Sequence, residues 1–323
     1  MLRTYGPDCD GSVIDPDGAI PPGATWIDLE QPTRDEEKLV ERAVGFDVPT
    51  REEMKEIEPS SRLFERGEAI YMTLSTLFGI EEGHPSAEPI AFVLAGNRLI
   101  TVRYTSPKPF RVFADHVRRE PELARDALTV LVRLLDTIID RLADELEAAG
   151  TEIEHISDQI FRRGEGKSRR IPAIRLEALL TRIGRAQSLL ARIRETAVSS
   201  SRVIGFLSAS SRLRGEIPER EHVLSLAADV GSLIDHSAFL ATNLTFLLDA
   251  SLGLISVEQN AAIKVFSVAA LIFLPPTLVA GIYGMNFDHM PELHWLTGYP
   301  WALGIMLLSA VLPYWIFKRN GWL

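Results

Sequence analysis

Two long apolar runs without a charged residue lie close to the C-terminus of this chain. Residues 265–285 read VFSVAALIFLPPTLVAGIYGM, and residues 297–317 read TGYPWALGIMLLSAVLPYWIF. At a rise of about 1.5 Å per residue, a helix of either length crosses the roughly 30 Å hydrocarbon core of a bilayer. Because the connection between the runs is short, we expect a membrane-spanning helical hairpin rather than two buried core helices.

The charges that flank the two runs predict their orientation. Lys264 precedes the first run, and Lys318 and Arg319 follow the second, whereas the connection carries Asp288 and Glu292 but no Lys or Arg. Lys and Arg are enriched on the cytoplasmic side of membrane helices. The flanks therefore predict a multi-pass protein of the cell's inner (plasma) membrane, with both termini in the cytoplasm and the connection outside.

Upstream of these runs the chain is polar. Its 323 residues carry a formal net charge of -10 and a single cysteine, Cys9. One cysteine excludes an intramolecular disulfide, and the net acidity argues against a nucleic-acid partner. We find no Gly-rich phosphate loop and no pairing of a nucleophile with a base, so the sequence predicts neither an enzyme nor a bound cofactor.

Residues 1–118 mix strand and helix signals and predict a cytoplasmic α+β domain. Asn97 lies between two apolar runs and indicates a hairpin turn. Thr33, followed three residues later by Glu36, is typical of a capping box at the start of a helix. The strands are expected at residues 24–29, 70–76, 89–95 and 98–104.

Residues 119–264 predict a helical stalk, because apolar side chains recur at three- and four-residue steps. The last of its helices has no breaker before Pro275, so it is expected to continue into the first apolar run, and the two earlier helices to pack against it as an antiparallel stalk. Residues 265–323 then form the membrane hairpin and tail. The expected segments are helices at 123–161, 173–213 and 219–285, with turns at 162–170 and 215–218.

A stripe of small and polar residues follows the longest predicted helix at steps of about 3.5 residues, the spacing of a seam between parallel helices. A stripe of this kind lines a water-filled path when several copies surround an axis, or it lets membrane helices pack closely. The residues alone leave both interpretations open. The stripe consists of Asp249, Gly253, Ser256, Asn260, Ile263, Ser267, Ala270, Leu274, Thr277, Gly281 and Gly284.

The first apolar run ends in Tyr-Gly-Met-Asn-Phe at residues 283–287, which resembles the signature of the CorA family of magnesium transporters. The surrounding sequence strengthens the resemblance: FLPPTLVAGIYGMNF is followed by Met-Pro-Glu-Leu at 290–293 and by a second span with a basic end. The resemblance is close from Asn260 to the C-terminus. It implies a funnel-shaped homopentamer in membrane lipid that carries Mg²⁺, with the first membrane helix of each subunit lining the pore.

The resemblance also implies roles for individual residues. Gly284, Met285 and Asn286 correspond to the selectivity filter, in which neutral amide oxygens grip a hydrated Mg²⁺ through its waters. Capping the helix C-terminus is the alternative role for Asn286. Glu292 in the outer loop corresponds to a position that gathers cations at the entrance.

Deeper positions follow in the same way. Asn260 and Thr277 correspond to family positions that offer oxygens to the hydration shell of the ion. Ile263, Phe266 and Leu274 correspond to apolar constrictions that gate by width and dewetting, although Phe266 lies one residue off the stripe. Asp249 corresponds to an acidic inner mouth.

Three functions remain distinguishable. The first is Mg²⁺ uptake, with Co²⁺ and Ni²⁺ as further cargo and closure by intracellular Mg²⁺. The second is transport of Zn²⁺ or another transition metal by a member of the same superfamily. The third is a membrane-tethered cytoplasmic sensor without transport. Asp229 and Asp235 are acidic candidates for sensing, but no motif identifies a regulatory site, and the spacing of His289 and His294 is not diagnostic of zinc.

Overall fold

The computed structural model describes residues 1–15, 17–56, 58–161, 173–213, 217–286, 290–291 and 295–319. Two compact units make up the chain: the first comprises Met1–Lys167 and Ala173–Leu248, and the second contains Asp249–Leu323. The predicted turn at 162–170 lies outside the described residues, as do Glu292, Asp288, His289 and His294. The divisions expected after residues 118 and 264 remain predictions.

A seven-stranded mixed sheet forms the centre of the N-terminal domain, in the order β2-β1-β3-β7-β6-β5-β4. β3 and β7 run parallel, whereas the other neighbouring pairs are antiparallel. The β6–β7 pair is the hairpin predicted at Asn97. The strands are β1 (Leu2–Gly6), β2 (Cys9–Ile14), β3 (Trp26–Glu30), β4 (Leu63–Arg66), β5 (Ala69–Phe78), β6 (Ser86–Ala95) and β7 (Arg98–Arg103).

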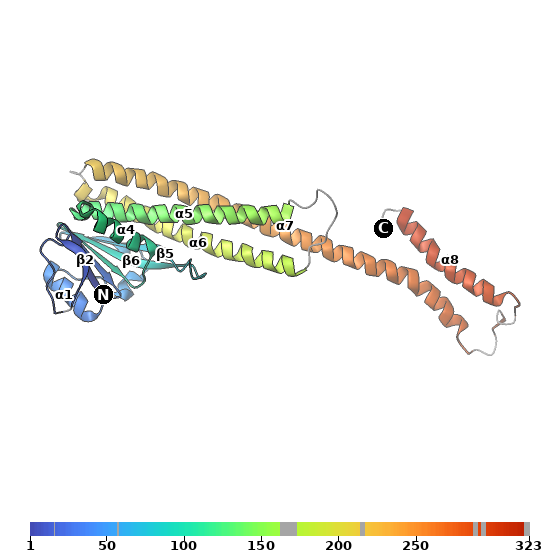
Figure 1. The fold of residues 1–323 in the computed structure, drawn as a ribbon. Helices are drawn as coiled ribbons and strands as arrows, with labels where there is room; N and C mark the ends of the chain where they lie inside the picture. Colours follow the sequence, from blue (N-terminus) through green and yellow to red (C-terminus); the bar gives the residue numbers. More distant parts are fainter. Residues whose placement is uncertain are drawn as a thin grey trace. The chain divides into compact units, whose positions relative to one another are not determined.

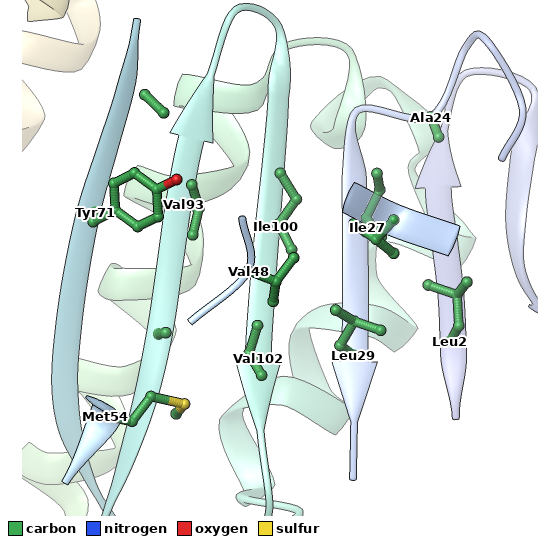
Figure 2. Close-up of a cluster of buried hydrophobic side chains, with 13 residues drawn as sticks. Leu2, Ala24, Ile27, Leu29, Val48, Met54, Tyr71, Val93, Ile100 and Val102 are labelled. Atoms are coloured by element: carbon green, nitrogen blue, oxygen red, sulfur yellow. The ribbon is translucent and has the colours of Figure 1, made fainter. Parts of the chain in front are cut away.

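Helix α1 (Arg34–Val44) covers one face of this sheet. Its predicted capping box is confirmed, because Thr33 and Glu36 bond reciprocally to each other's backbone N–H groups. Val40 packs into a core with Leu2 and the apolar side chains that β3 and β7 direct to this face. Figure 2 shows these side chains, among them Ile27, Leu29, Ile100 and Val102, on one side of neighbouring strands. Short helices α2 (Arg51–Met54) and α3 (Pro59–Arg62) lie between α1 and β4 in the chain.

Helix α4 (Lys108–Arg119) packs on the opposite face. Alternation along β3 places Trp26 there, and its ring lies 6.5 Å from that of Phe110 and 5.3 Å from that of Phe113. Tyr5 stacks on the indole at 4.4 Å. The one-turn helix η1 (Pro121–Ala124) follows α4. The helices that follow β3 and β7 therefore lie on different faces of the sheet.

Three long helices complete the first unit, as Figure 1 shows. α5 (Ala127–Phe161) and α6 (Ala173–Ala209) are antiparallel, as expected, and Arg182 bonds Glu152 across them at 2.7 Å. In the contacts between α5 and α7 (Ile217–Tyr283), the residue numbers increase in the same direction along both helices, from Thr129 with Glu219 to Phe161 with Phe246. These two helices are therefore parallel, and the expectation that both earlier helices oppose the last one is wrong for α5. A short helix, η2 (Ser211–Leu213), follows α6.

The apolar runs form the end of α7 and helix α8 (Gly298–Arg319). Within the described part of the chain, these two helices are long and apolar enough to cross a membrane, and their most apolar stretches are not buried within the single chain. A soluble core helix would be buried, unlike these stretches. The α+β domain, the long helices and the two C-terminal apolar helices of the expected fold class are thus confirmed. α7 begins at Ile217, so Pro218 belongs to the first turn of the helix rather than to the expected turn at 215–218.

Candidate ion pathway

The predicted pathway residues lie along one continuous helix in the second unit. Asp249, Asn260 and Thr277 are exposed on α7. Residues of the small and polar stripe that are seven positions apart, such as Asn260 and Ser267, lie on nearly the same side of a helix that turns about 100° per residue. The structure thus brings the inner, middle and outer parts of the predicted pathway onto a common, slowly turning stripe.

The three predicted apolar constrictions are among the most exposed large side chains of the chain. Ile263 is 61% exposed, Phe266 75% and Leu274 67%. Val265, which lies on nearly the opposite side of the helix from Ile263 and Leu274 at about 100° per residue, is also exposed, at 59%. The whole circumference of this segment therefore lacks protein neighbours within one chain, and both lipid and further copies of the chain have room to contact it.

Thr277 is oriented by its own helix. Its Oγ1 donates a hydrogen bond to the Phe273 carbonyl oxygen at 2.7 Å. Because the hydroxyl proton is directed at the helix, the oxygen lone pairs remain for an outside donor. The waters around a cation present their hydrogens outward, so an acceptor of this kind suits a hydrated ion.

Two backbone carbonyls add polarity near Leu274, and the side-chain pattern did not point to them. Pro275 and Pro276 lie inside α7. Proline has no N–H, so neither residue donates to the carbonyl four residues earlier. Those carbonyls belong to Leu271 and Ile272. In an apolar segment, an acceptor without its helical donor requires water or another polar group, and the signal for it in the sequence was the Pro-Pro pair.

The C-terminal end of α7 shows why glycine follows Tyr283. Gly284 N–H donates to the Ala280 carbonyl at 2.9 Å, and Met285 N–H donates to that of Ile282 at 3.2 Å. A Cβ on Gly284 would lie 3.1 Å from the Ala280 oxygen, closer than ordinary van der Waals contact. The tight turn ends the helix, and Asn286 follows at once as an exposed residue.

Acidic side chains gather elsewhere, on the long helices of the first unit. Asp140 on α5 is an exposed residue whose carboxyl is partly shielded from water. This partial desolvation raises its pKa, and the carboxylates of Asp136, Asp144 and Asp229 raise it further. Asp229, an expected sensing candidate on α7, therefore belongs to a group of like charges, while Asp235 is exposed on the same helix. Within the described residues, no three His, Cys, Asp or Glu side chains are placed to hold a metal ion together.

Comparison with known proteins agrees with this architecture. The family model described as CorA-like Mg²⁺ transporter protein matches residues 22–319. Magnesium transport protein CorA of Escherichia coli K12 is 34% identical over 300 residues, which cover 93% of this chain and 92% of the relative. The same protein of Salmonella typhimurium LT2 has the same identity and coverage.

Solved structures extend the similarity to the fold. The complete CorA magnesium transporter of Methanocaldococcus jannaschii superposes with a TM-score of 0.77 at 20% identity, covering 100% of this chain and 98% of that one. The cytoplasmic domain of ZntB from Vibrio parahaemolyticus gives 0.52 at 12% identity, covering 73% of this chain and 87% of that domain. At these identities the likeness shows the fold alone.

Proposed function

Because this chain belongs to the CorA-like Mg²⁺ transporter family, we propose that it forms a Mg²⁺ channel in the inner membrane, with several copies arranged around a pore lined by α7. The observation that carries the proposal is the exposed stripe of α7, which runs without a break into Gly284, Met285 and Asn286. The apolar α8 then packs outside α7 and faces lipid.

Assembly is required by the number of spans. Two membrane helices cannot enclose a path, so a pore needs several copies around a closed symmetry axis. The number five is taken from the family resemblance. The exposed apolar side chains around the membrane part of α7 support association, since neighbouring copies and lipid together would cover them.

Magnesium chemistry assigns the roles along the pore. Mg²⁺ loses its waters reluctantly, so a ring of Asn286 amides would hold the hydrated ion by accepting hydrogen bonds from its waters. Thr277 and Asn260 would provide further acceptors along the path. Ile263, Phe266 and Leu274 would form apolar constrictions that dewet when narrow, and a ring of Asp249 carboxylates would concentrate cations at the inner mouth.

Closure by intracellular Mg²⁺ is part of the proposal. Like charges around Asp140 repel one another, so a divalent ion near this surface would relieve that repulsion. Glu292 is proposed to gather cations at the outer entrance. The membrane potential would drive uptake without a nucleotide, and no catalytic step is involved.

Mg²⁺ is favoured over Zn²⁺ by a specific observation. The proteins that share 34% of their residues with nearly the whole chain are named magnesium transport proteins, whereas ZntB shares only the fold. Co²⁺ and Ni²⁺, which are close to Mg²⁺ in size and hydration, are proposed as further cargo. A sensor without transport would not need the small and polar stripe.

Purified protein in liposomes tests the proposal directly. Uptake of Mg²⁺, Co²⁺, Ni²⁺ and Zn²⁺ is measured under an inside-negative potential, and the subunit number is determined in detergent by light scattering. We expect Mg²⁺ uptake by an oligomer of about five copies. Uptake of Zn²⁺ alone would favour the transition-metal transporter, and an assembled protein without any flux would favour the sensor.

A further inference from the structure

The N-terminal domain contains a cavity of about 450 Å³ that the transport function does not use. It lies on the α4 face of the sheet, opposite the apolar cluster of Figure 2. Its volume is within the range of small-molecule sites, roughly 300–1,000 Å³. The lining side chains that matter here are Arg3, Tyr5, Asp28, Glu30, Arg103 and Arg111.

The position of the cavity follows from the sheet topology. β3 and β7 are parallel and end together, with Glu30 opposite Arg103. The chain leaves β3 toward α1 on one face and leaves β7 toward α4 on the other. Such a switch point opens a crevice at the carboxyl ends of the strands, where ligands of mixed α/β folds commonly bind.

Gln31 forms the wall of this crevice where the chain turns from β3 toward α1. Its φ of 46° is positive, which is uncommon for a residue other than glycine. Its N–H donates to the Arg103 carbonyl at 2.7 Å, and its Nε2 donates to that of Tyr104 at 3.2 Å. The strained turn is thus held in place by the end of β7, and it fixes the position of Gln31 in the wall of the crevice.

The charged side chains of the crevice differ in how many of their polar atoms have a bonding partner. Arg103 bonds both acids, Asp28 Oδ2 at 2.8 Å and Glu30 Oε2 at 2.9 Å. Arg3 Nε is buried and has no hydrogen-bond partner among the residues that the structure describes. Arg111 is exposed at the rim. Arg3 Nη2 donates to Met1 Sδ at 3.2 Å, but Arg3 Nε and the Arg111 guanidinium remain for an added acceptor, whereas both carboxylates are already bonded by Arg103.

The backbone adds to this positive character. α4 begins beside the cavity with Lys108 and carries no acidic residue in its first turn. In the described part of the chain, no side chain caps its N-terminus. α1, by contrast, has Asp35 and Glu37 in its first turn and a complete capping box. Lys108 is paired with Glu81 at 3.2 Å, Pro109 has no N–H, and the Phe110 N–H donates to the Pro107 carbonyl at 3.1 Å. The positive end of the α4 dipole therefore acts on the cavity through its field rather than through free N–H groups.

We propose that this crevice binds a small phosphate-bearing molecule. A phosphate has enough oxygens to accept from Arg3 and Arg111 together, and the apolar faces of Tyr5 and Phe110 would contact the rest of the ligand. A cation is disfavoured because Asp28 and Glu30 already have a partner. The site does not depend on ion transport.

Calorimetric titration of the full chain in detergent with inorganic phosphate, in the presence of EDTA, tests the inference. We expect saturable binding that Arg111→Gln and Arg3→Gln each weaken by about tenfold or more. Arg119→Gln, at the other end of α4, is the matched control and should stay within about twofold of the wild type. Each variant's elution profile and thermal midpoint verify its folding.

Three results would overturn the proposal. The first is the absence of saturable phosphate binding by the wild type, and the second is unchanged affinity in folded Arg111→Gln. The third is binding of acetate or citrate at least as tight as that of phosphate, which would assign the crevice to carboxylates. Mg²⁺ uptake is measured independently, so failure here does not bear on transport.

Discussion

Arg103 on β7 and Asp28 on β3 form a two-point ion pair inside the N-terminal domain, with Nη2 2.8 Å from Oδ2 and Nε 3.1 Å from Oδ1. Their side chains are 4% and 3% exposed. Thr101 also donates to Asp28, at 2.7 Å, and receives a bond from the indole of Trp26 at 3.0 Å. The pair thus fixes the register of the two parallel strands at the base of the proposed crevice.

We predict that Arg103→Met destabilises the N-terminal domain by about 3–5 kcal/mol, because Asp28 is left as an unpaired buried carboxylate. Adding Asp28→Leu should recover most of the loss, since an apolar pair replaces the ion pair. Urea unfolding followed by tryptophan fluorescence measures both changes. Arg66→Met is the control: its partner Asp47 is exposed, so a loss below about 1 kcal/mol is expected. Equal losses in both arginine variants would contradict the role of burial.

The like charges near Asp140 predict a dependence of stability on pH. The pKa of Asp140 is raised on folding by partial desolvation of its carboxyl and then by the carboxylates of Asp136, Asp144 and Asp229. A carboxyl with a raised folded pKa costs no stability below its unfolded pKa, near 4. It destabilises the fold as the pH rises through its folded pKa.

Asp140→Asn should therefore raise the thermal midpoint at pH 7 and have little effect at pH 3.5. Because Asp140 is exposed, the gain should be about 0.5 kcal/mol or less. Differential scanning fluorimetry at the two pH values measures it. Asp235→Asn provides the comparison, since Asp235 is an exposed carboxylate of α7 that does not act on Asp140. An equal gain at both pH values would show that repulsion is not the cause.

The strength of local sequence signals explains which parts of the fold were predictable. β3, β5, β6 and β7 are rich in β-branched and aromatic residues, which favour strands. The Thr33–Glu36 capping box involves residues only three positions apart, so the local sequence also reveals it. β2 contains Asp10 and Gly11, and β4 is a short edge strand, so neither has a strong strand pattern. The pairing of Asp28 with Arg103 joins residues far apart in the sequence, which no local pattern encodes.

The placement of the proposed pathway residues on one side of α7 was predictable for a related reason. These residues follow one another along a single helix, so periodicity alone places them on one stripe. The switch-point crevice was not predictable, because it depends on β3 and β7 being parallel neighbours. The crevice becomes visible only when the sheet order is known.

We predict that Phe266→Gly raises basal Mg²⁺ flux in proteoliposomes by widening an apolar constriction. Val265→Gly is the matched control, because it introduces the same flexible residue on roughly the opposite side of the α7 stripe, at about 100° per residue. Both side chains are exposed in the single chain, so neither change should leave a core cavity. Equal flux in the two variants would remove Phe266 from the gate and attribute any increase to helix flexibility.

Asn286 carries the sharpest prediction for selectivity. It follows the tight turn at Gly284 and is exposed where α7 ends. Replacing it with Ala removes the amide but leaves the helix and the net charge unchanged, so folding should change by about 0.5 kcal/mol or less. Mg²⁺ uptake should nevertheless fall by about tenfold or more, because the hydrated ion loses acceptors for its outward-pointing hydrogens.

Two further variants separate the amide's chemistry from its position. Asn286→Asp would place a ring of carboxylates at the outer end of the pore, which should bind divalent cations more tightly and pass them more slowly. Asn286→Gln keeps the amide on a longer side chain and should retain more uptake than Ala. Uptake of each reconstituted variant is measured with its oligomer size determined on the same sample. Wild-type uptake and ion preference from a correctly assembled Asn286→Ala would mean that Asn286 only caps the helix, and the selectivity element would then have to lie deeper, near Thr277.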